Sequence, residues 1–397
     1  MRALALFSIA LLIGCPTEPD PPIDESTYNY VTGATTEVLA AQAAVRWAPD
    51  DLGLDWIQTV LAWGFLRLHE ADPSGAHDAF GDTWIAGHVA EFEGVDSKEF
   101  VSSDSMSPAS VAASLMADDS ARAFTPVTDA AFAYLDALPR TADGAFPHWG
   151  PEHSLFGDTL QVWVDSQFMI GMTLLQEFRR TGDQALLTEW VDQYRLFSDL
   201  CRDPADQLYR HAWDDLAGVN IPAEAIYWNR GNSWVLVSAA EFLRLAPDHP
   251  DAGEIAALFI AHLEATFATQ RDDGLFWTVL NAPFGDDARN YPETSGSALI
   301  GYALAVALKT EVVQGDAWEE RLFALAEGIG TTLSEEDGAL VLRGTSFGTN
   351  PGDYDNYVNT ITLPDQIVGV GAVLMFLAEL DWMDAPRPGA FSMTTGE

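Results

Sequence analysis

The stretch Gln161–Phe178 reads QVWVDSQFMIGMTLLQEF, and it indicates how the rest of the chain must be organised. Apart from Asp165, Ser166 and Gln167, it stays almost entirely apolar as far as Gln176. A helix without a polar face belongs inside a larger helical assembly, because it has no side to turn toward water. A carboxylate one turn into such a helix is costly unless it is paired or used in chemistry. The stretch therefore predicts a buried helix and marks Asp165 as a candidate functional residue.

Two kinds of helical segment alternate along the chain. The odd-numbered ones are amphipathic, as in the apolar stripe of 187–197, whereas the even-numbered ones are apolar nearly all round, as in 234–245 and 298–308. Half-buried helices that alternate with fully buried ones are what two concentric rings require. The predicted segments are 34–47, 54–70, 79–93, 107–117, 125–138, 161–180, 184–200, 232–246, 252–269, 294–309, 315–332 and 364–382. We therefore predict an all-α fold, an (α/α)6 barrel, rather than a helical solenoid, which would repeat its sequence at a fixed period.

The links between these segments also alternate. Those that lead from an odd segment to an even one are long, at 139–160, 201–231, 270–293 and 333–363, while the return links after residue 180 are short. Long loops tend to carry function and short ones close hairpins. The functional site is therefore predicted at the end of the barrel where the buried helices begin.

Composition limits the class of partner. The 397 residues carry a formal net charge of −41, which argues against nucleic-acid binding because phosphate contacts need clustered Lys and Arg. An anionic substrate would need a local positive group against this field. We predict one catalytic domain over 34–385 and a C-terminal tail over 386–397. The oligomeric state is left open.

The N-terminus resembles an export signal. The apolar run 3–13 is too short to span a bilayer, and it ends in a Leu-Ile-Gly-Cys sequence that resembles a bacterial lipobox. We predict a signal peptide over 1–15, lipidation of Cys15, and a Pro-rich extended tether over 16–33. The protein would then be an exported lipoprotein, anchored on a periplasmic or cell-surface membrane face by lipid alone. The alternatives are an ordinary signal peptide with a chance cysteine, or a start site placed too early.

Aromatic residues, carboxylates and histidines gather in the loops before the buried helices. They surround Asp104, His148, Asp165, His211 and the segment 228–234. Trp rings pack on the apolar faces of sugars while polar groups bind the hydroxyls. No metal-ligand spacing, phosphate-binding glycine loop or nucleophilic serine motif is found. The pattern predicts a carbohydrate site with a carboxylic acid as catalyst, and no metal or cofactor.

Motifs over roughly residues 100–382 resemble glycoside hydrolase family 105, the unsaturated rhamnogalacturonyl hydrolases, which are related to the family 88 unsaturated glucuronyl hydrolases. In chain order they are PRTADGAFPHW, WVDSQFM, YRHAWDD, YWNRGNSW, ETSGSALIGYALA, GTSFGTNPGDYDNY and LPDQIVGVGAVL. The family fold is an (α/α)6 barrel, in agreement with the ring argument. Each motif alone is weak, but their common order is specific.

The resemblance implies a substrate and a reaction. The substrate is a lyase-generated oligosaccharide with a 4,5-unsaturated uronic acid at its non-reducing end. An acid protonates the double bond at C4, water adds at C5, and the resulting hemiketal falls apart. Asp165 matches the general acid and base, and Asp104 matches a second aspartate that binds substrate and tunes the acid.

Further residues match those that line the sugar subsite in the family. These substrate-binding candidates are His148, Trp163, Met169, His211, Trp228, Arg230 and Trp234. Arg230 is expected to supply the positive charge that an anionic uronate needs. A free Asp has a pKa near 3.9. Burial and a nearby carboxylate are expected to raise the pKa of Asp165, against the pull of the helix N-terminus.

Simpler interpretations of these residues stay open. Asp165 and Asp104 suit helix-start positions, His211 suits a structural loop histidine, and Trp228 and Trp234 suit core aromatics. Two other functions also fit: an inverting glycosidase that acts on saturated oligosaccharides with both aspartates, or a sugar-binding lipoprotein without catalysis.

The sequence also departs from the family pattern. Pro147, Asn229 and Ser233 replace residues that are common in the walls of the sugar site, so they put the substrate range in doubt more than the reaction.

Overall fold

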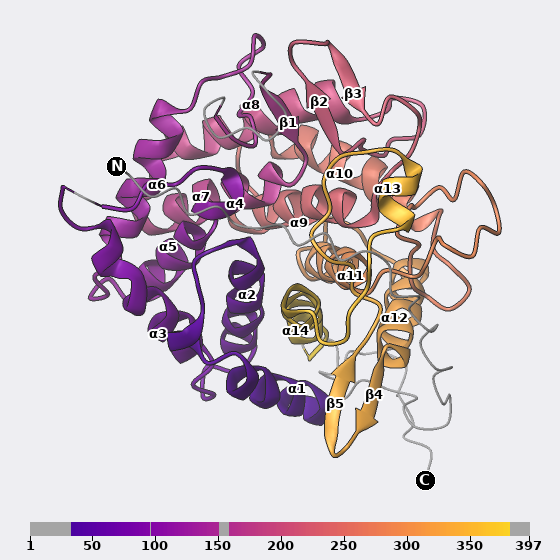
Figure 1. Ribbon diagram of the computed structural model, residues 1–397, viewed down its shortest axis with the longest axis horizontal. Coiled ribbons are helices and arrows are strands. Elements are labelled where there is room, and N and C mark those ends of the chain that lie inside the picture. Colours follow the sequence, from indigo (N-terminus) through magenta and orange to yellow (C-terminus); the bar gives the residue numbers. More distant parts are fainter. Residues whose placement is uncertain (1–32, 96, 151–158, 382–397) are drawn as a thin grey trace, which may run out of the picture.

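Helices dominate the computed structural model, which describes residues 33–95, 97–150 and 159–381 (Figure 1). Of fourteen α-helices, α4 (Ser103–Met106) and α13 (Tyr354–Val358) span only four and five residues, and the other twelve form two concentric rings. Each of the twelve predicted segments contains most of one long helix, so the all-α prediction is confirmed.

Six helices form the inner ring, in which each packs against the next and the last packs against the first. They are α2 (Trp56–Ala71), α5 (Pro108–Asp118), α7 (Ser166–Thr181), α9 (Asn229–Leu245), α11 (Thr294–Lys309) and α14 (Ile367–Asp381). Every residue of 229–243 in α9 and 294–308 in α11 is buried. These are the segments whose sequence is apolar nearly all round, as a helix with no solvent face requires.

Six helices form the outer ring, and each covers an inner neighbour. They are α1 (Gly33–Arg46), α3 (Asp78–His88), α6 (Thr125–Ala137), α8 (Gln184–Cys201), α10 (Ala252–Phe267) and α12 (Asp316–Thr331). Helix α8 buries one stripe of side chains that includes Leu187, Trp190 and Tyr194, and exposes the opposite side. The odd and even segments therefore occupy the outer and inner rings as predicted.

The ring closes where α2 and α14 approach each other closely. A Cβ added at Gly64 would lie 2.8 Å from the carbonyl oxygen of Gly371, and one added at Gly371 would lie 2.6 Å from the backbone of Leu61. Any side chain here would push the two helices apart. The two glycines thus join the last inner helix to the first.

The start of the buried stretch 161–180 was predicted wrongly as helix. Residues Gln161–Trp163 form strand β1, which pairs with β2 (Ala212–Asp214), and β2 pairs with β3 (Val219–Ile221). Helix α7 begins only at Ser166, so Asp165 is its N-cap residue and not a residue one turn inside. The short apolar run Val162–Val164 suits a buried strand as well as a helix, and its partner strand lies about fifty residues away.

The barrel also contains several other short elements. Strands β4 (Leu333–Glu336) and β5 (Ala339–Leu342) form a hairpin whose turn, Asp337 and Gly338, has positive φ at both residues. Two short 3-10 helices, η1 (Pro49–Asp51) and η2 (Val89–Phe92), contact α3. The helix predicted over 79–93 therefore ends as an α-helix at His88, and η2 forms the rest of that segment. The sequence analysis found no strands, because these elements are too short to show a period.

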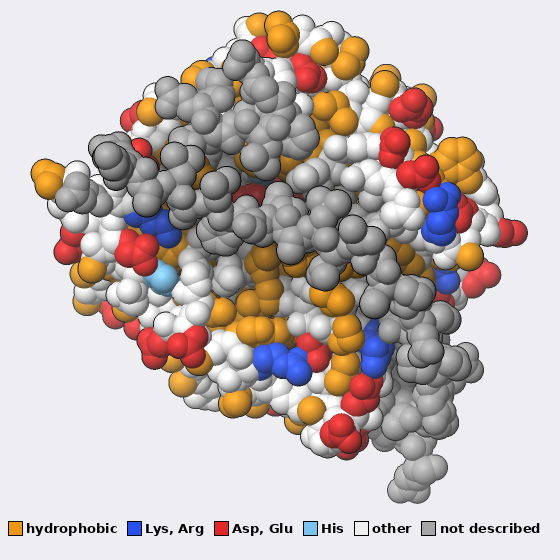
Figure 2. Space-filling model, in the orientation of Figure 1, with side chains coloured by type: hydrophobic (Ala, Val, Ile, Leu, Met, Phe, Trp, Pro, Cys, Tyr) orange, Lys and Arg blue, Asp and Glu red, His pale blue; other side chains and the backbone are white. Residues whose placement is uncertain are grey.

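Several predictions fall outside the described residues: the signal peptide over 1–15 with Cys15, the tether over 16–33 except its last residue, and the tail over 386–397. Among the described residues, no helix combines the length and apolarity needed to cross a membrane. In the face shown in Figure 2, Asp and Glu side chains are scattered around the rim among apolar ones.

Candidate active site

Asp165 lies at the start of α7 and contacts a histidine on the loop before β2. The Oδ2 atom of Asp165 is 3.1 Å from Nε2 of His211, and both side chains are buried. On the other side of the imidazole, Nδ1 lies 3.1 Å from the hydroxyl of Tyr357, which accepts the N–H of Gly352 at 3.3 Å. The tyrosine hydroxyl therefore donates to Nδ1, and the ring proton on Nε2 faces Asp165.

A second aspartate and histidine repeat this arrangement. Nε2 of His148 lies 3.5 Å from Oδ2 of Asp104, and Nδ1 lies 2.8 Å from the hydroxyl of Ser103. Ser103 accepts the hydroxyl proton of Ser166 at 3.0 Å, so its own proton is directed to His148. The side chain of Asp104 is 26% exposed, whereas that of Asp165 is 12% exposed. The structure thus brings both predicted aspartates to the end of the barrel where the inner helices begin, called here the mouth, and each aspartate has one histidine beside it.

Aromatic rings join the two pairs. Trp163 stacks on His148 at 4.1 Å between ring centroids and meets the ring of His211 edge-on at 5.5 Å. Trp228 stacks on the ring of His211 at 4.3 Å between ring centroids. These rings hold both imidazoles in fixed orientations.

The aromatic residues are walls rather than the exposed platforms expected from sequence. Trp163, Trp228 and Trp234 are 4%, 2% and 0% exposed, and Met169 is 1% exposed. Trp234 packs edge-on to Trp56 at 6.2 Å. For Trp234 the structure therefore favours the core-aromatic interpretation, while Trp228 contacts a histidine of the candidate site.

The charge state of Asp165 differs from the expectation. Burial opposes its ionisation, but the imidazole of His211, the hydrogen bond to it and the more distant His148 outweigh burial, so the pKa of Asp165 lies below its ordinary value. Burial lowers the pKa of His211, against the attraction of the carboxylate. The prediction of a raised pKa was wrong because sequence did not show the histidine in contact.

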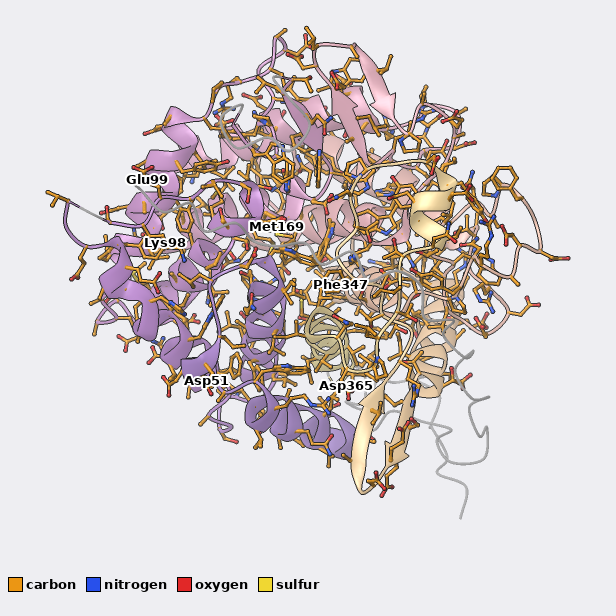
Figure 3. All side chains as sticks on the ribbon, viewed as in Figure 1. Asp51, Lys98, Glu99, Met169, Phe347 and Asp365 are labelled. Atoms are coloured by element: carbon orange, nitrogen blue, oxygen red, sulfur yellow. The ribbon has the colours of Figure 1, made fainter. Side chains whose placement is uncertain are left out.

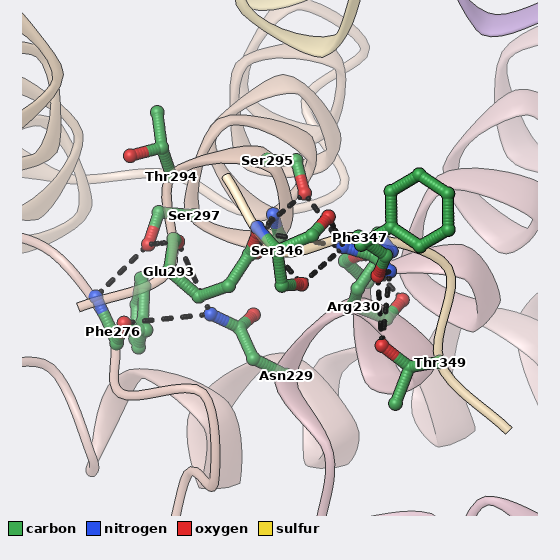
Figure 4. Close-up of polar contacts among 12 residues, drawn as sticks. Asn229, Arg230, Phe276, Glu293, Thr294, Ser295, Ser297, Ser346, Phe347 and Thr349 are labelled. Carbon is green, nitrogen blue, oxygen red and sulfur yellow. Dashed lines mark hydrogen bonds and ion pairs between the residues drawn. The ribbon is translucent and has the colours of Figure 1, made fainter. Parts of the chain in front are cut away.

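Arg230 lies in the first turn of α9, and its guanidinium is bound by neighbouring groups (Figure 4). Its Nη1 donates to the hydroxyl of Ser346 at 2.6 Å and lies 3.4 Å from Oε1 of Glu293, while its Nη2 donates to the carbonyl of Phe347 at 2.8 Å. The guanidinium and the Glu293 carboxylate are both fully buried. The positive charge that was expected to face a uronate is therefore largely neutralised by Glu293, and only Nε lacks a hydrogen-bond partner.

Three residues that the sequence analysis missed join this mouth. Tyr357 contacts His211, and Trp56 lies between Arg230 and Trp234. Asp55 is an exposed residue at the N-cap of α2, where desolvation by the surrounding protein and the charge of Asp104 raise its pKa to about 6. The sequence Asp55-Trp56, an acidic residue and an aromatic residue at the start of a buried segment, could have identified these two residues as candidates.

Two of the three departures from the family pattern, Asn229 and Ser233, lie within α9, and the third, Pro147, is buried. Ser233 donates to the carbonyl of Arg230 within α9, and the amide nitrogen of Asn229 lies 3.5 Å from the carbonyl oxygens of Phe276 and Glu293. Both side chains are buried. Within the described ranges, no group of three or more acidic, histidine or cysteine side chains is arranged to hold a metal ion.

Comparison of the sequence with known proteins identifies a family and several related enzymes. The model of Glycosyl Hydrolase Family 88 matches residues 29–383. The unsaturated rhamnogalacturonyl hydrolase YesR of Bacillus subtilis is 30% identical over 252 residues, which are 62% of this chain and 67% of that protein. An unsaturated 3S-rhamnoglycuronyl hydrolase of an Alteromonas species is 26% identical over 232 residues, 55% of this chain and 50% of that protein.

Solved structures share the fold. A possible family 105 member from Klebsiella pneumoniae superposes with a TM-score of 0.76 at 20% identity, covering 92% of this chain and 99% of that one. The unsaturated glucuronyl hydrolase of a Bacillus species superposes with a TM-score of 0.64 at 14% identity, covering 88% and 95%. The predicted (α/α)6 barrel is therefore confirmed. With this fold, the family match over most of the chain and the relationship to YesR, the protein belongs to the group of related enzymes formed by glycosyl hydrolase family 88 and the unsaturated rhamnogalacturonyl hydrolases of family 105.

Proposed function

We propose that this enzyme removes a 4,5-unsaturated uronic acid from the non-reducing end of lyase-generated oligosaccharides, with Asp165 as its acid and base. The observation that carries the assignment is the contact of Asp165 with His211, 3.1 Å long, in a buried and aromatic-walled mouth. A carboxyl group with a histidine that supplies or accepts a proton is suited to acid–base work.

The reaction can be followed atom by atom. The carboxylic acid of Asp165 gives its proton to C4 while the double-bond electrons form the new C–H bond, and the ring oxygen stabilises the positive charge at C5. Water attacks C5 and returns a proton to the Asp165 carboxylate, which leaves a hemiketal. Opening of that hemiketal yields a ketone at C5 and a hemiacetal at C1, which releases the leaving sugar.

The proton must come from the Asp165–His211 pair as a unit. The pKa of Asp165 is held low and burial lowers the pKa of His211, so in the free enzyme the carboxylate is ionised and the imidazole carries one proton, on Nε2. The pair must therefore take up one more proton before Asp165 can act as the acid. A bound uronate brings a negative charge beside the pair, and a nearby negative charge favours the protonated form. Substrate binding is therefore expected to promote delivery of the proton to Asp165.

One assay separates this function from its rivals. The enzyme is incubated with lyase-generated oligosaccharides, and loss of the ultraviolet absorbance of the conjugated uronate is followed. Decay that disappears in Asp165→Asn supports the proposal. Saturable binding without decay identifies a sugar-binding protein, and release of reducing sugar from saturated substrates alone identifies an inverting glycosidase.

We also propose that the protein is a lipoprotein anchored through Cys15, on the basis of its lipobox-like sequence. Labelled fatty acid should enter the full-length protein expressed in a bacterial host, and Cys15→Ser should abolish that labelling. Export without labelling would leave an ordinary signal peptide.

A further inference from the structure

We propose that Phe347 is the platform against which the leaving sugar packs, and that Arg230 and Glu293 hold it in place. The inference rests on the proposed function, since it assigns the leaving side of the same site. It concerns the loop Ser346–Thr349, called here the clamp loop.

The backbone of the clamp loop is fixed on both sides. The N–H of Phe347 donates to the carbonyl of Ile361 at 3.0 Å, and its carbonyl accepts from Nη2 of Arg230 at 2.8 Å. Glu293 accepts the N–H of Ser346 at 3.0 Å. The same carboxylate caps α11 through the N–H of Gly296 at 2.6 Å. A buried ion pair thus ties the loop to two inner helices (Figure 4).

The side chain of Phe347 is exposed to solvent, although its backbone is held by hydrogen bonds. It is 51% exposed, although the residues before it, Thr345 and Ser346, are fully buried. A single exposed apolar residue is ordinary on a protein surface. An exposed aromatic ring on an immobilised backbone is instead preorganised for binding, because little further order is lost when a partner arrives.

The clamp loop lies at the mouth of the site. A Cβ added at Gly348 would lie 3.9 Å from the ring of Trp56. Arg230, which binds the loop, also lies over the ring of Trp228 at 4.8 Å, and Trp228 stacks on His211. In the view down the barrel, Phe347 and Met169 are both found near the centre of the helical ring (Figure 3). Contacts through Arg230 and Trp228 therefore connect the backbone of Phe347 to the Asp165–His211 pair.

This position suits the leaving sugar better than the uronate. The rings that pack on the two site histidines are Trp163 and Trp228, which are 4% and 2% exposed and form a closed wall. The sugar beyond the scissile bond has to lie farther toward solvent. Sugar rings present C–H groups on one face, and these pack on an aromatic ring. We therefore assign Phe347 to a pyranose on the leaving side.

The experiment compares two substrates that share the unsaturated uronate. One is the lyase-generated disaccharide, and the other is the methyl glycoside, which has no leaving sugar ring. Phe347→Ala is expected to raise KM for the disaccharide roughly three- to tenfold with kcat little changed, because packing is lost equally in ground and transition states. On the methyl glycoside, which has no leaving sugar to pack on the ring, Phe347→Ala should leave kcat/KM close to the wild-type value.

Further variants separate packing from folding. Phe347→Tyr should keep the wild-type preference for the disaccharide, and Phe347→Leu, which is apolar but not flat, should lose it. Phe284, 64% exposed on another loop, provides the matched control, so Phe284→Ala should behave as wild type. If Arg230 acts by holding the loop, Arg230→Lys and Phe347→Ala should have non-additive effects on the preference.

Two outcomes overturn the inference in different ways. Equal effects of Phe347→Ala on both substrates, or no effect on either, refute the platform while the wild-type activity still supports the proposed function. A wild-type enzyme that consumes neither substrate refutes both.

Discussion

Two buried carboxylates of the inner ring, Asp165 and Glu241, lie in contrasting surroundings. Asp165 stands at the mouth, where its partner is the imidazole of His211. Glu241 lies on α9, with Nη2 of Arg244 at 2.6 Å and Nη1 of Arg67 at 3.9 Å. Burial opposes ionisation of Glu241, but Arg244 and Arg67 outweigh it and lower its pKa to about 2.

The identity of the partner decides what each carboxylate can do. A guanidinium does not release its proton in a protein, so the Glu241 cluster keeps its charges at every working pH. An imidazole gains and loses a proton near neutrality, so the Asp165 pair can exchange one. Arg67 on α2 reaches across the ring to α9, which suggests that the Glu241 cluster serves stability and the Asp165 pair serves chemistry.

The sharpest test of the contrast is Asp165→Asn. An amide has no proton to give, so kcat should fall by about a thousandfold, within the range that general acid–base catalysis contributes. The uronate absorbance assay measures the loss, and thermal unfolding should show a stability close to wild type. A variant that retains a tenth of the activity would remove Asp165 from the acid role.

Glu241→Gln is expected to lower stability and to leave kcat unchanged. Within the described part of the chain, the substitution leaves Glu70, 2.8 Å from Arg67 and 3.4 Å from Arg244, as the one carboxylate that pairs with both arginines, and Arg67 is fully buried. The free energy of unfolding should therefore fall by about 3 kcal/mol. Urea denaturation measures this loss, and the folded fraction should keep its kcat. The control is Glu254→Gln, because Glu254 is 49% exposed in its pair with Arg195 and such pairs contribute about 1 kcal/mol or less. Equal effects of the two substitutions would contradict the importance of the Glu241 cluster.

The contrast also shows what sequence can and cannot predict. Helix periodicity is local, so the two rings and the mouth could be predicted from alternating amphipathic and apolar segments. Asp104, Asp165, His148 and His211 could be selected as candidates because they lie in or next to the loops before the inner helices. Strand β1 could not be predicted, because a three-residue strand is defined by its partner β2 and not by its own sequence.

Long-range contacts set the properties that sequence predicted wrongly. The hydroxyl of Tyr357 meets His211 across 146 residues, and Glu293 neutralises Arg230 across 63. Apolar neighbours of Asp165 suggested a raised pKa, but the imidazole that lowers it comes from a different loop. Charge state therefore depended on contacts that no local pattern records.

A smaller effect is expected from Tyr357→Phe. Without the hydroxyl, Nδ1 of His211 loses its donor, and the tautomer with its proton directed away from Asp165 becomes accessible. We expect kcat to fall by about tenfold, with a smaller change in KM and an altered pH profile. Nitrogen NMR of labelled histidine reports the tautomer directly. Tyr354→Phe on the same short helix is the control, and an unchanged His211 tautomer in Tyr357→Phe would refute the positioning role.

The smallest expected effect is a displacement between two pH profiles. The Asp165–His211 pair must hold the proton that is delivered, so activity falls as pH rises through the pKa of the pair. The profile of kcat/KM reports the free enzyme, and that of kcat reports the complex. The negative charge of the bound uronate favours the protonated pair, because buried Glu293 already neutralises Arg230. The falling limb of kcat should therefore lie about one unit above that of kcat/KM, at constant ionic strength. If the falling limbs of the kcat and kcat/KM profiles coincide, another group compensates the negative charge of the uronate. The proton would then reach Asp165 without help from the substrate.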